Sequence, residues 1–191
     1  MKSPQSPPAI LEIIGYSGAG KTTLIERLIP YLRRRGLRVA VVKHTSHHHE
    51  FDKPGKDSHR LRMAGAESVF VSSPKMVAMF REVASEWPLE RMLRLMPRRV
   101  DLVIAEGFKN GEHPCLEVFR RGLSKDLISR GRWNLLAVVG DDPGDLEVPY
   151  FSRETIAAIG ELVIEKVVKP CPQDDSRRFY ENNFRSRPLR A

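Results

Sequence analysis

Short apolar runs alternate along the chain with segments whose apolar positions recur at helical spacing. Residues 9–14 form a β-branched run that ends on Gly15, and residues 21–35 place leucines on one helical face. This pattern predicts a strand, a glycine loop and a helix. Gly36 is expected to end the helix, and a second strand is expected over residues 37–43. A strand, helix, strand unit implies a right-handed parallel crossover.

The remainder of the chain continues this alternation. Further strands are expected over residues 68–72, 101–106, 116–119 and 135–139, and further helices over residues 57–64, 88–96 and 153–168. Alternating strands and helices, with strands that are apolar almost throughout, indicate an α/β fold. We expect a mostly parallel sheet with helices on both faces.

Composition narrows the class of protein. The apolar runs are far shorter than the roughly 20 residues that cross a bilayer, and the proline-rich N-terminus does not resemble an export signal. We therefore expect a cytoplasmic protein without a membrane partner. The net charge of +8 suits a polyanionic partner, but the arginine groups are scattered, so nucleic acid is not expected. Cys115 and Cys171 lack a paired spacing, and both are expected to be reduced thiols, with Cys115 a buried bystander.

The strongest chemical signal is a complete G-x-x-x-x-G-K-T motif between a predicted strand and a predicted helix. Backbone N–H groups of such a loop wrap a phosphate chain, and the N-terminus of the following helix adds positive potential. Lys21 is expected to neutralise phosphate charge, the Thr22 hydroxyl to bind Mg²⁺, and Gly20 to adopt backbone angles that other residues avoid. The expected nucleotide-binding residues of this loop are Gly15, Ser17, Gly18, Ala19, Gly20, Lys21, Thr22 and Thr23.

Magnesium chemistry at a phosphate loop also needs a carboxylate at the end of a neighbouring strand. Glu106 ends the predicted strand 101–106, so it can face the loop, whereas Asp101 enters the strand at the opposite end. We expect Glu106 to be a metal ligand and a catalytic group. Asp57 is a second candidate for both roles, through a water molecule or by orienting an attacking water. The alternative is that Asp57 caps the helix that follows it.

Two other segments carry candidate chemistry. The consecutive histidines His47–His49 suggest a metal site, but adjacent side chains in a loop rarely converge on one ion, so a dedicated site is not expected. The common guanine signature Asn/Thr-Lys-x-Asp is absent. Asp141 follows the predicted strand 135–139, where a carboxylate can accept both guanine N–H groups. The alternative for Asp141 is an Asp-Asp-Pro turn.

Five segments occur along the chain in a characteristic order. They are Gly15–Thr22, Lys43-His44, Pro54–Ser58, Ala64–Ala66 and Glu106–Lys109. In this order they resemble the MobB family, the molybdopterin-guanine dinucleotide biosynthesis adaptor proteins. The resemblance extends from about residue 9 to residue 168.

The resemblance implies a P-loop NTPase fold, GTP binding with weak hydrolysis and a homodimer. It also implies partnership with the guanylyltransferase that attaches GMP to molybdopterin. In this chain Lys21 and Thr22 would hold phosphates and magnesium, Glu106 would take the acidic position, and Asp141 would read guanine. The remaining cleft residues that the resemblance implies are Lys43, His44, Asp57 and Lys109.

We therefore expect a flexible N-terminus over residues 1–8, a P-loop nucleotide-binding domain over 9–169 and a disordered basic tail over 170–191. The expected function is that of a GTP-binding adaptor with at most a slow GTPase activity. Two alternatives stand beside it. A small-molecule kinase would need a second pocket and an arginine-bearing lid, and a metal-insertion GTPase would use His47–His49.

Overall fold

The structure, a computed structural model, describes residues 7–45, 49–97, 99–108, 111–124, 126–144 and 146–169. The chain divides into two compact units, the first comprising Met1–His44 and Met96–Ala191 and the second Thr45–Leu95. The predicted domain bounds stay predictions. Among the described residues, no helix combines the length and the apolar character that crossing a membrane requires.

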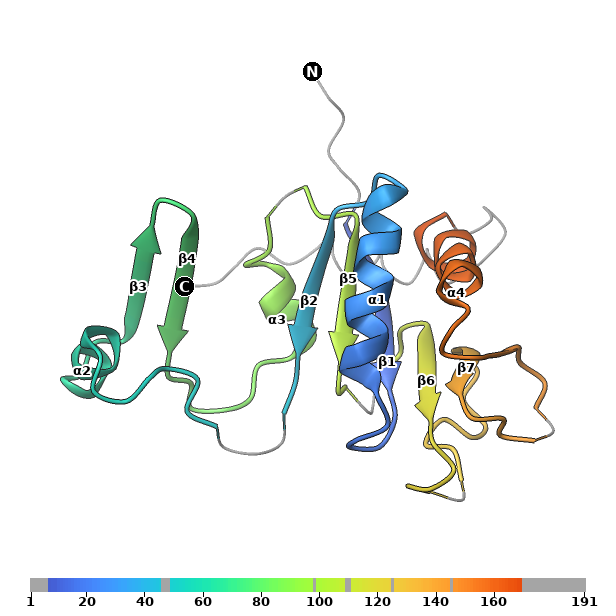
Figure 1. The fold of residues 1–191 in the computed structure, drawn as a ribbon. Helices are drawn as coiled ribbons and strands as arrows, with labels where there is room; N and C mark the ends of the chain where they lie inside the picture. The colour runs from blue at the N-terminus through green and yellow to red at the C-terminus, as the bar shows by residue number, and fades with distance from the viewer. Residues whose placement is uncertain are drawn as a thin grey trace. The chain divides into compact units, whose positions relative to one another are not determined.

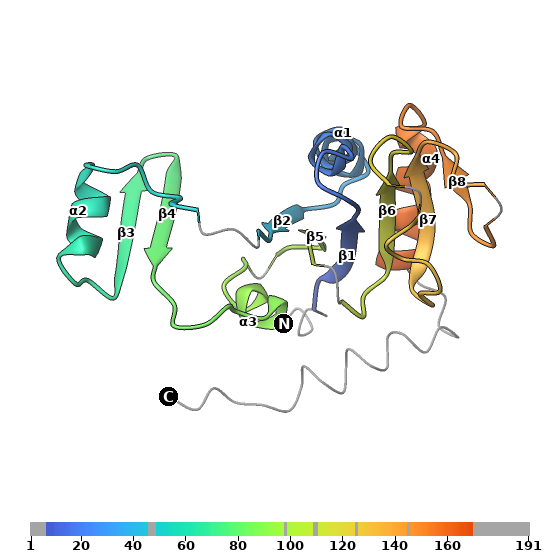
Figure 2. The same cartoon turned by 90° about the horizontal axis from the view of Figure 1, so that it is seen from below.

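The first unit is built on a six-stranded parallel sheet with the order β2-β5-β1-β6-β7-β8 (Figure 1; Figure 2 shows β8 beside β7). Its strands are β1 (Ala9–Ile14), β2 (Val39–Lys43), β5 (Leu102–Glu106), β6 (Cys115–Phe119), β7 (Leu135–Gly140) and β8 (Tyr150–Phe151). Its helices are α1 (Lys21–Arg34) and α4 (Ile156–Val163), and a π-helical turn over Ile164–Val168 continues α4. The α/β fold with a mostly parallel sheet is thus confirmed.

Helices α1 and α4 share one buried core with the sheet. Leu28 and Leu32 of α1 and Ile159 of α4 are fully buried in a cluster that also holds Leu11 and Ile104 from the sheet. Alternate residues of a strand point to opposite faces, so this cluster occupies one face. Burial of such side chains is the main favourable contribution to folding, about 1.5–3 kcal/mol for each.

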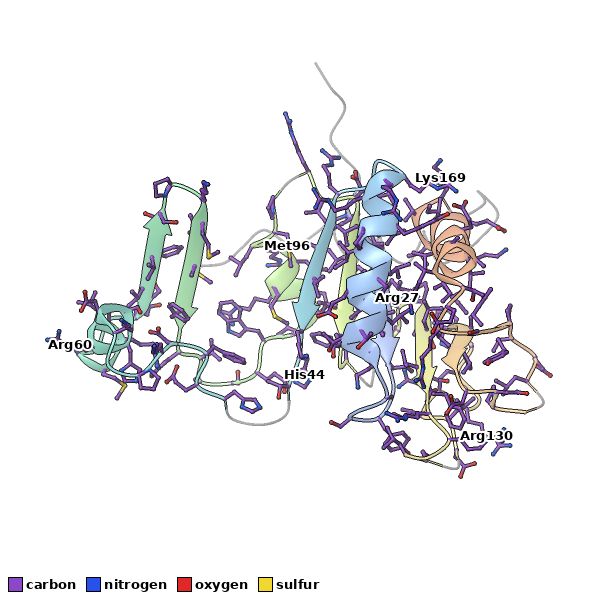
Figure 3. The ribbon with its side chains drawn as sticks, viewed as in Figure 1. Arg27, His44, Arg60, Met96, Arg130 and Lys169 are labelled. Atoms are coloured by element: carbon purple, nitrogen blue, oxygen red, sulfur yellow. The ribbon has the colours of Figure 1, made fainter. Side chains whose placement is uncertain are left out.

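Gly160 lies where α4 packs closely against α1. A Cβ atom added there would lie 2.3 Å from Cδ1 of Tyr31. The Tyr31 hydroxyl donates a hydrogen bond of 2.5 Å to Glu161, which holds the ring in this position. Arg27 of α1, labelled in Figure 3, adds a hydrogen bond of 2.8 Å to the carbonyl oxygen of Arg153.

The opposite face of the sheet contains buried polar groups. Glu12 of β1 and Glu117 of β6 are both fully buried. Glu117 accepts hydrogen bonds of 2.8 Å from the backbone N–H groups of Ile128 and Ser129, and one from the Ser129 hydroxyl. Glu117 therefore anchors the loop before β7, because a buried carboxylate is tolerated only with such partners.

The second unit contains α2 (Asp57–Met63), β3 (Ser68–Ser73), β4 (Met76–Arg81) and α3 (Leu89–Leu93). Strands β3 and β4 form a two-stranded antiparallel sheet. Arg62 of α2 forms ion pairs with Glu50 and with Glu82, the latter at 2.6 Å. This arginine thereby ties α2 to the segments on either side of it.

Strand β3 is confirmed, whereas β4 and β8 were not predicted from the sequence. The segment Met76–Arg81 is apolar without alternation, and residues 74–75 lack the glycine or asparagine typical of hairpin turns. Here the Ser73 hydroxyl oxygen accepts a hydrogen bond of 3.1 Å from the Met76 N–H and holds the turn. Strand β8 spans two residues, too short for a period to show.

Two helices differ in extent from the prediction. The helix predicted over 153–168 begins at Ile156, because the Thr155 N–H and hydroxyl both donate to the Ser152 carbonyl and close a turn before it. Its end is π-helical, and the Lys169 N–H donates to the Ile164 carbonyl at 2.9 Å. The helix predicted over 88–96 is shorter, spanning Leu89–Leu93.

The contact between α1 and α4 predicts the effect of Gly160→Ala. An added methyl group overlaps the Tyr31 ring, so we expect the free energy of unfolding to fall by about 1–3 kcal/mol. This loss should occur although alanine favours helices over glycine by about 1 kcal/mol. Urea denaturation measures the change. Gly122→Ala, where an added Cβ meets nothing within 4 Å, is the control and should stay within about 0.5 kcal/mol of the unaltered protein.

Because Cys115 is buried in β6, we predict that its thiol is unreactive. Burial, reinforced by the negative charge of Glu12, raises the pKa of Cys115 from 9.0 to about 12. The folded protein therefore keeps this thiol protonated at pH 8. The stability that the raised pKa gives is lost as the pH rises from 9.0 towards the folded value of about 12. In a Cys171→Ser variant, Cys115 should react with a disulfide reagent at pH 8 at least about 100-fold more slowly than in guanidinium chloride. Equal rates would show that Cys115 is accessible in the folded protein.

Candidate functional site

The glycine loop connects β1 to α1 at the carboxyl end of the sheet. Gly15 leaves β1 with φ +140°, and a Cβ there would lie 2.4 Å from the carbonyl oxygen of Val118. Only glycine therefore permits the loop to cross β6 so closely. Gly20 is the N-cap of α1 and has φ +102°, as the sequence analysis expected. The first N–H groups of α1 lack carbonyl partners within the helix and are suited to an anion.

Lys21, the first residue of α1, folds back onto this loop. Its ammonium group donates hydrogen bonds to the carbonyl oxygens of Gly15, at 2.9 Å, and Tyr16, at 2.8 Å. The loop thus curls around a positive charge, the electrostatic requirement for binding phosphate. The other predicted loop residues comprise exposed Ser17, Gly18 and Thr23 and buried Ala19.

Thr22 and Glu106 meet beside the loop. The Thr22 hydroxyl lies 3.0 Å and 3.2 Å from the two carboxylate oxygens of Glu106 and donates to that carboxylate. Glu106 ends β5 with its side chain only 8% exposed. A hydroxyl and a carboxylate are hard oxygen donors of the kind that Mg²⁺ prefers. Asp101, by contrast, lies at the start of β5, where Arg38 hydrogen-bonds to it and lowers the pKa of its carboxyl.

The position of Glu106 depends on how β2 and β5 end. The His44 N–H donates to the Glu106 carbonyl at 2.8 Å, and Gly107 follows with φ +91°. A Cβ at Gly107 would lie 2.7 Å from the His44 carbonyl oxygen. The rings of His44 and Phe108 then lie 5.2 Å apart at the carboxyl end of β2, where Figure 3 labels His44.

Lys43 completes the group of charges beside the loop. It is opposite Glu106 in the parallel register of β2 and β5. Its ammonium nitrogen lies 3.2 Å from the Thr22 hydroxyl oxygen and 3.4 Å from a Glu106 carboxylate oxygen. The structure therefore brings Lys43, Thr22 and Glu106 together from three separate elements.

Asp141 lies directly after β7 and is held by two arginines. One carboxylate oxygen accepts a hydrogen bond of 3.0 Å from the Arg121 N–H, and the other lies 3.6 Å from the Arg153 guanidinium. The Asp141 side chain is 45% exposed, so part of the carboxylate faces solvent. Each carboxylate oxygen can accept more than one hydrogen bond.

Asp57 belongs to the second unit and is the first residue of α2. Its side chain is 94% exposed and lies 3.6 Å from Arg60, and α2 has no side-chain cap. The cap considered for Asp57 is therefore absent from this helix. Its metal and catalytic roles stay predictions. The neighbouring Asp52 is buried instead, and it accepts a hydrogen bond of 2.9 Å from the Ser58 hydroxyl.

Several predicted positions lie outside the described residues. They are His47, His48 and Lys109, together with Cys171 in the tail. Within the described parts of the chain, no group of three or more His, Cys, Asp or Glu side chains is placed to hold a metal ion. His49 is the one histidine of this run that the structure describes, and its ring centroid lies 6.3 Å from that of Phe51.

Three charged residues in or beside the strands of the sheet were not predicted from the sequence to have a role. Arg153 donates to the Phe119 carbonyl at 3.2 Å besides facing Asp141, and no sequence signal marked it. Glu12 and Glu117 did leave a signal, since each interrupts an otherwise apolar strand. A charge within such a strand indicates a buried polar group.

Comparisons with known proteins agree with this geometry. The model of the family "Molybdopterin guanine dinucleotide synthesis protein B" (MobB) matches residues 10–141. The molybdopterin-guanine dinucleotide biosynthesis adapter protein of Escherichia coli is 35% identical over 167 residues, covering 84% of this chain and 94% of that protein. The protein of the same name from Haemophilus influenzae is 35% identical over 155 residues, covering 81% of this chain and 86% of that protein.

Solved structures give the same result. The crystal structure of molybdopterin-guanine biosynthesis protein B (mobB) superposes with a TM-score of 0.66 and 35% identity, covering 81% of this chain and 97% of that one. The MobB homologue from Bacillus stearothermophilus superposes with a TM-score of 0.61 and 28% identity. The match covers 82% of this chain and 99% of that one. The resemblance seen in the sequence and the P-loop NTPase fold are confirmed, and the chain belongs to the MobB family.

Proposed function

We propose that this protein binds GTP with Mg²⁺ at the loop of residues 15–22 and acts as an adaptor in the synthesis of molybdopterin guanine dinucleotide. Its partner in this proposal is the guanylyltransferase that converts molybdopterin to that dinucleotide. The observation that carries the nucleotide part is the contact of Thr22 with Glu106 beside the Lys21 loop. Family membership supports the adaptor part.

Each part of a magnesium nucleotide has a fitting group in this arrangement. The N-terminus of α1 and the Lys21 ammonium favour the phosphates. Thr22 and Glu106 offer the oxygen donors that would hold Mg²⁺, and the ion would supply positive charge to neutralise the phosphates. Lys43 and His44, at the end of β2, would line the same cleft.

Guanine recognition is assigned to Asp141. A carboxylate accepts hydrogen bonds from both the ring and exocyclic N–H groups of guanine, whereas adenine does not present two donors in that arrangement. The side chain of Asp141 is partly exposed at the carboxyl end of β7, and its contact with the Arg121 N–H fixes its orientation. Lys109, outside the described residues, stays a candidate for the same cleft.

Hydrolysis is proposed to be slow. Glu106 would act through the metal, and Asp57 stays a candidate for orienting an attacking water. In the first unit Glu106 already bonds to Thr22 and faces Lys43, so it is suited to holding a cation rather than to activating water. A protein that retains GTP in this way can present it to a partner enzyme.

The homodimer is proposed to form through the β3–β4 hairpin of the second unit. Phe70 is 68% exposed and lies opposite Met79, and Val77 of the same face is also 68% exposed. Exposed apolar side chains that adjoin one another on a soluble domain typically mark an interaction surface. A second copy of the same hairpin would cover this face symmetrically.

Calorimetric titration tests the nucleotide assignment. With Mg²⁺ present, the protein should bind GTP more tightly than ATP, and Lys21→Ala should weaken GTP binding about 100-fold or more through loss of a charge-assisted phosphate contact. Asp141→Asn should reduce the preference for GTP over ATP about tenfold. Lys75→Ala, in the turn of the hairpin, is the matched control and should bind GTP as the unaltered protein does. Equal or stronger binding of ATP would favour the kinase alternative and remove Asp141 from base recognition.

Sedimentation velocity tests the proposed dimer. Phe70→Asp places a charge in the middle of the proposed interface, so we expect the dissociation constant of the dimer to rise at least about 30-fold, equivalent to about 2 kcal/mol. Phe51→Asp is a matched control, because Phe51 is 76% exposed in the same unit but lies outside the hairpin. An equal effect of the two substitutions would argue against the hairpin as the interface.

A further inference from the structure

Lys43 lies against the two side chains proposed above to hold Mg²⁺. The Lys43 ammonium nitrogen lies 3.2 Å from the Thr22 hydroxyl oxygen and 3.4 Å from a Glu106 carboxylate oxygen. These are the two groups that hold Mg²⁺ in the proposed function. Lys21, the lysine of the loop, instead points its ammonium at the carbonyl oxygens of Gly15 and Tyr16. The two lysines therefore contact different groups, and Lys43 is the one that faces the Glu106 carboxylate.

The buried state of Glu106 explains why a cation is needed at this point. Its side chain is 8% exposed, and a carboxylate removed from water is strongly destabilised unless a positive charge or hydrogen-bond donors compensate. Thr22 supplies one donor. Lys43 supplies the positive charge, and the parallel register that sets it opposite Glu106 keeps it within reach.

The side chain of Lys43 is also able to leave. It is 58% exposed, and its ammonium is a compact charge on a flexible four-carbon chain. Withdrawal into solvent or towards a bound phosphate therefore needs only rotation about side-chain bonds. The backbone that carries it is fixed, because the adjoining His44 N–H is hydrogen-bonded to the Glu106 carbonyl.

We propose that Lys43 is an internal counter-cation that competes with the divalent metal for Thr22 and Glu106. In the absence of metal its ammonium neutralises Glu106, and arrival of the metal displaces it towards the phosphates of the nucleotide. The inference rests on the proposed function in taking Thr22 and Glu106 as metal ligands. It adds that the nucleotide strengthens metal binding in this protein, because phosphates that attract the Lys43 ammonium free Thr22 and Glu106 for the metal.

Binding of Mn²⁺ alone tests the competition without any nucleotide. Electron paramagnetic resonance should show that Lys43→Met binds Mn²⁺ at least about tenfold more tightly than the unaltered protein, as expected when a competitor that occupies the ligands about nine-tenths of the time is removed. Lys43→Arg keeps the positive charge and should retain the weak affinity. Lys75→Met is the matched control for loss of an exposed lysine and should also bind as the unaltered protein does.

The higher Mn²⁺ affinity expected of Lys43→Met must also arise at Thr22 and Glu106, the proposed metal ligands. Adding Glu106→Gln to Lys43→Met should abolish the gain. Thermal denaturation monitors folding of every variant, and Lys43→Gln serves in place of Lys43→Met if the methionine variant does not fold. The proposal is overturned if neutral substitutions of Lys43 leave the Mn²⁺ affinity unchanged, or if the gain survives Glu106→Gln.

A second measurement separates this inference from the proposed function. The ratio of the GTP dissociation constants in EDTA and in Mg²⁺ should be up to about tenfold smaller in Lys43→Met than in the unaltered protein. By linkage this ratio equals the ratio of the metal dissociation constants without and with GTP, and the variant already binds the metal tightly without GTP. An unchanged ratio would contradict the counter-cation role. Failure of the unaltered protein to bind GTP in Mg²⁺ would instead refute the proposed function, while the Mn²⁺ titration would still decide the role of Lys43.

Discussion

The insertion of β5 between β1 and β2 is the constraint on which the candidate site depends. Parallel pairing aligns Ile13, Glu106 and Lys43 at one level of the sheet. Because the carboxyl ends of parallel strands lie at the same edge, the loop after β1, the acid of β5 and the lysine of β2 meet there. Three segments that are far apart in the sequence thereby form one cluster of charges, and a shift of one residue in either pairing would turn these side chains to the other face.

Close packing of the backbone at this edge holds the glycine loop and the end of β5 in place. Gly15 and Gly107 each lie against a carbonyl group of a neighbouring segment, and any side chain at either position would overlap that carbonyl. The strands that precede these glycines are buried, and the apolar side chains on one of their faces pack against α1 and α4. The loop of residues 15–22 and Glu106 are therefore held by the core, which is how a binding site keeps its geometry before a ligand arrives.

The sheet contains buried carboxylates whose surroundings give them different uses. Glu117 is satisfied by backbone N–H groups and a hydroxyl of the loop before β7, so its charge has a structural partner. Glu106 is compensated by a threonine hydroxyl and a lysine whose side chain is largely exposed. The first arrangement fixes a loop, whereas the second can exchange its cation. The partners of a buried acid, and not the acid itself, distinguish a structural role from a functional one.

The sequence by itself determined the features that depend on local order. The strand, loop and helix around residues 9–35, the left-handed Gly20 and the assignment of Glu106 to the loop end of its strand all follow from spacing and from the rule for parallel sheets. The resemblance to the MobB family was likewise visible in short segments. Strand β4 was not predicted because its apolar residues do not alternate with polar ones. Its extended conformation is evident only from its pairing with β3.

Only the tertiary structure decided which side chains meet. The contact of Lys43 with Thr22 and Glu106 requires the register of β2 on β5, which no local pattern specifies. The arginine partners of Asp141 come from loops that follow other strands. The physical reason is the same in each case: backbone propensity acts over a few residues, whereas a charged site forms from the ends of elements that the hydrophobic core brings together.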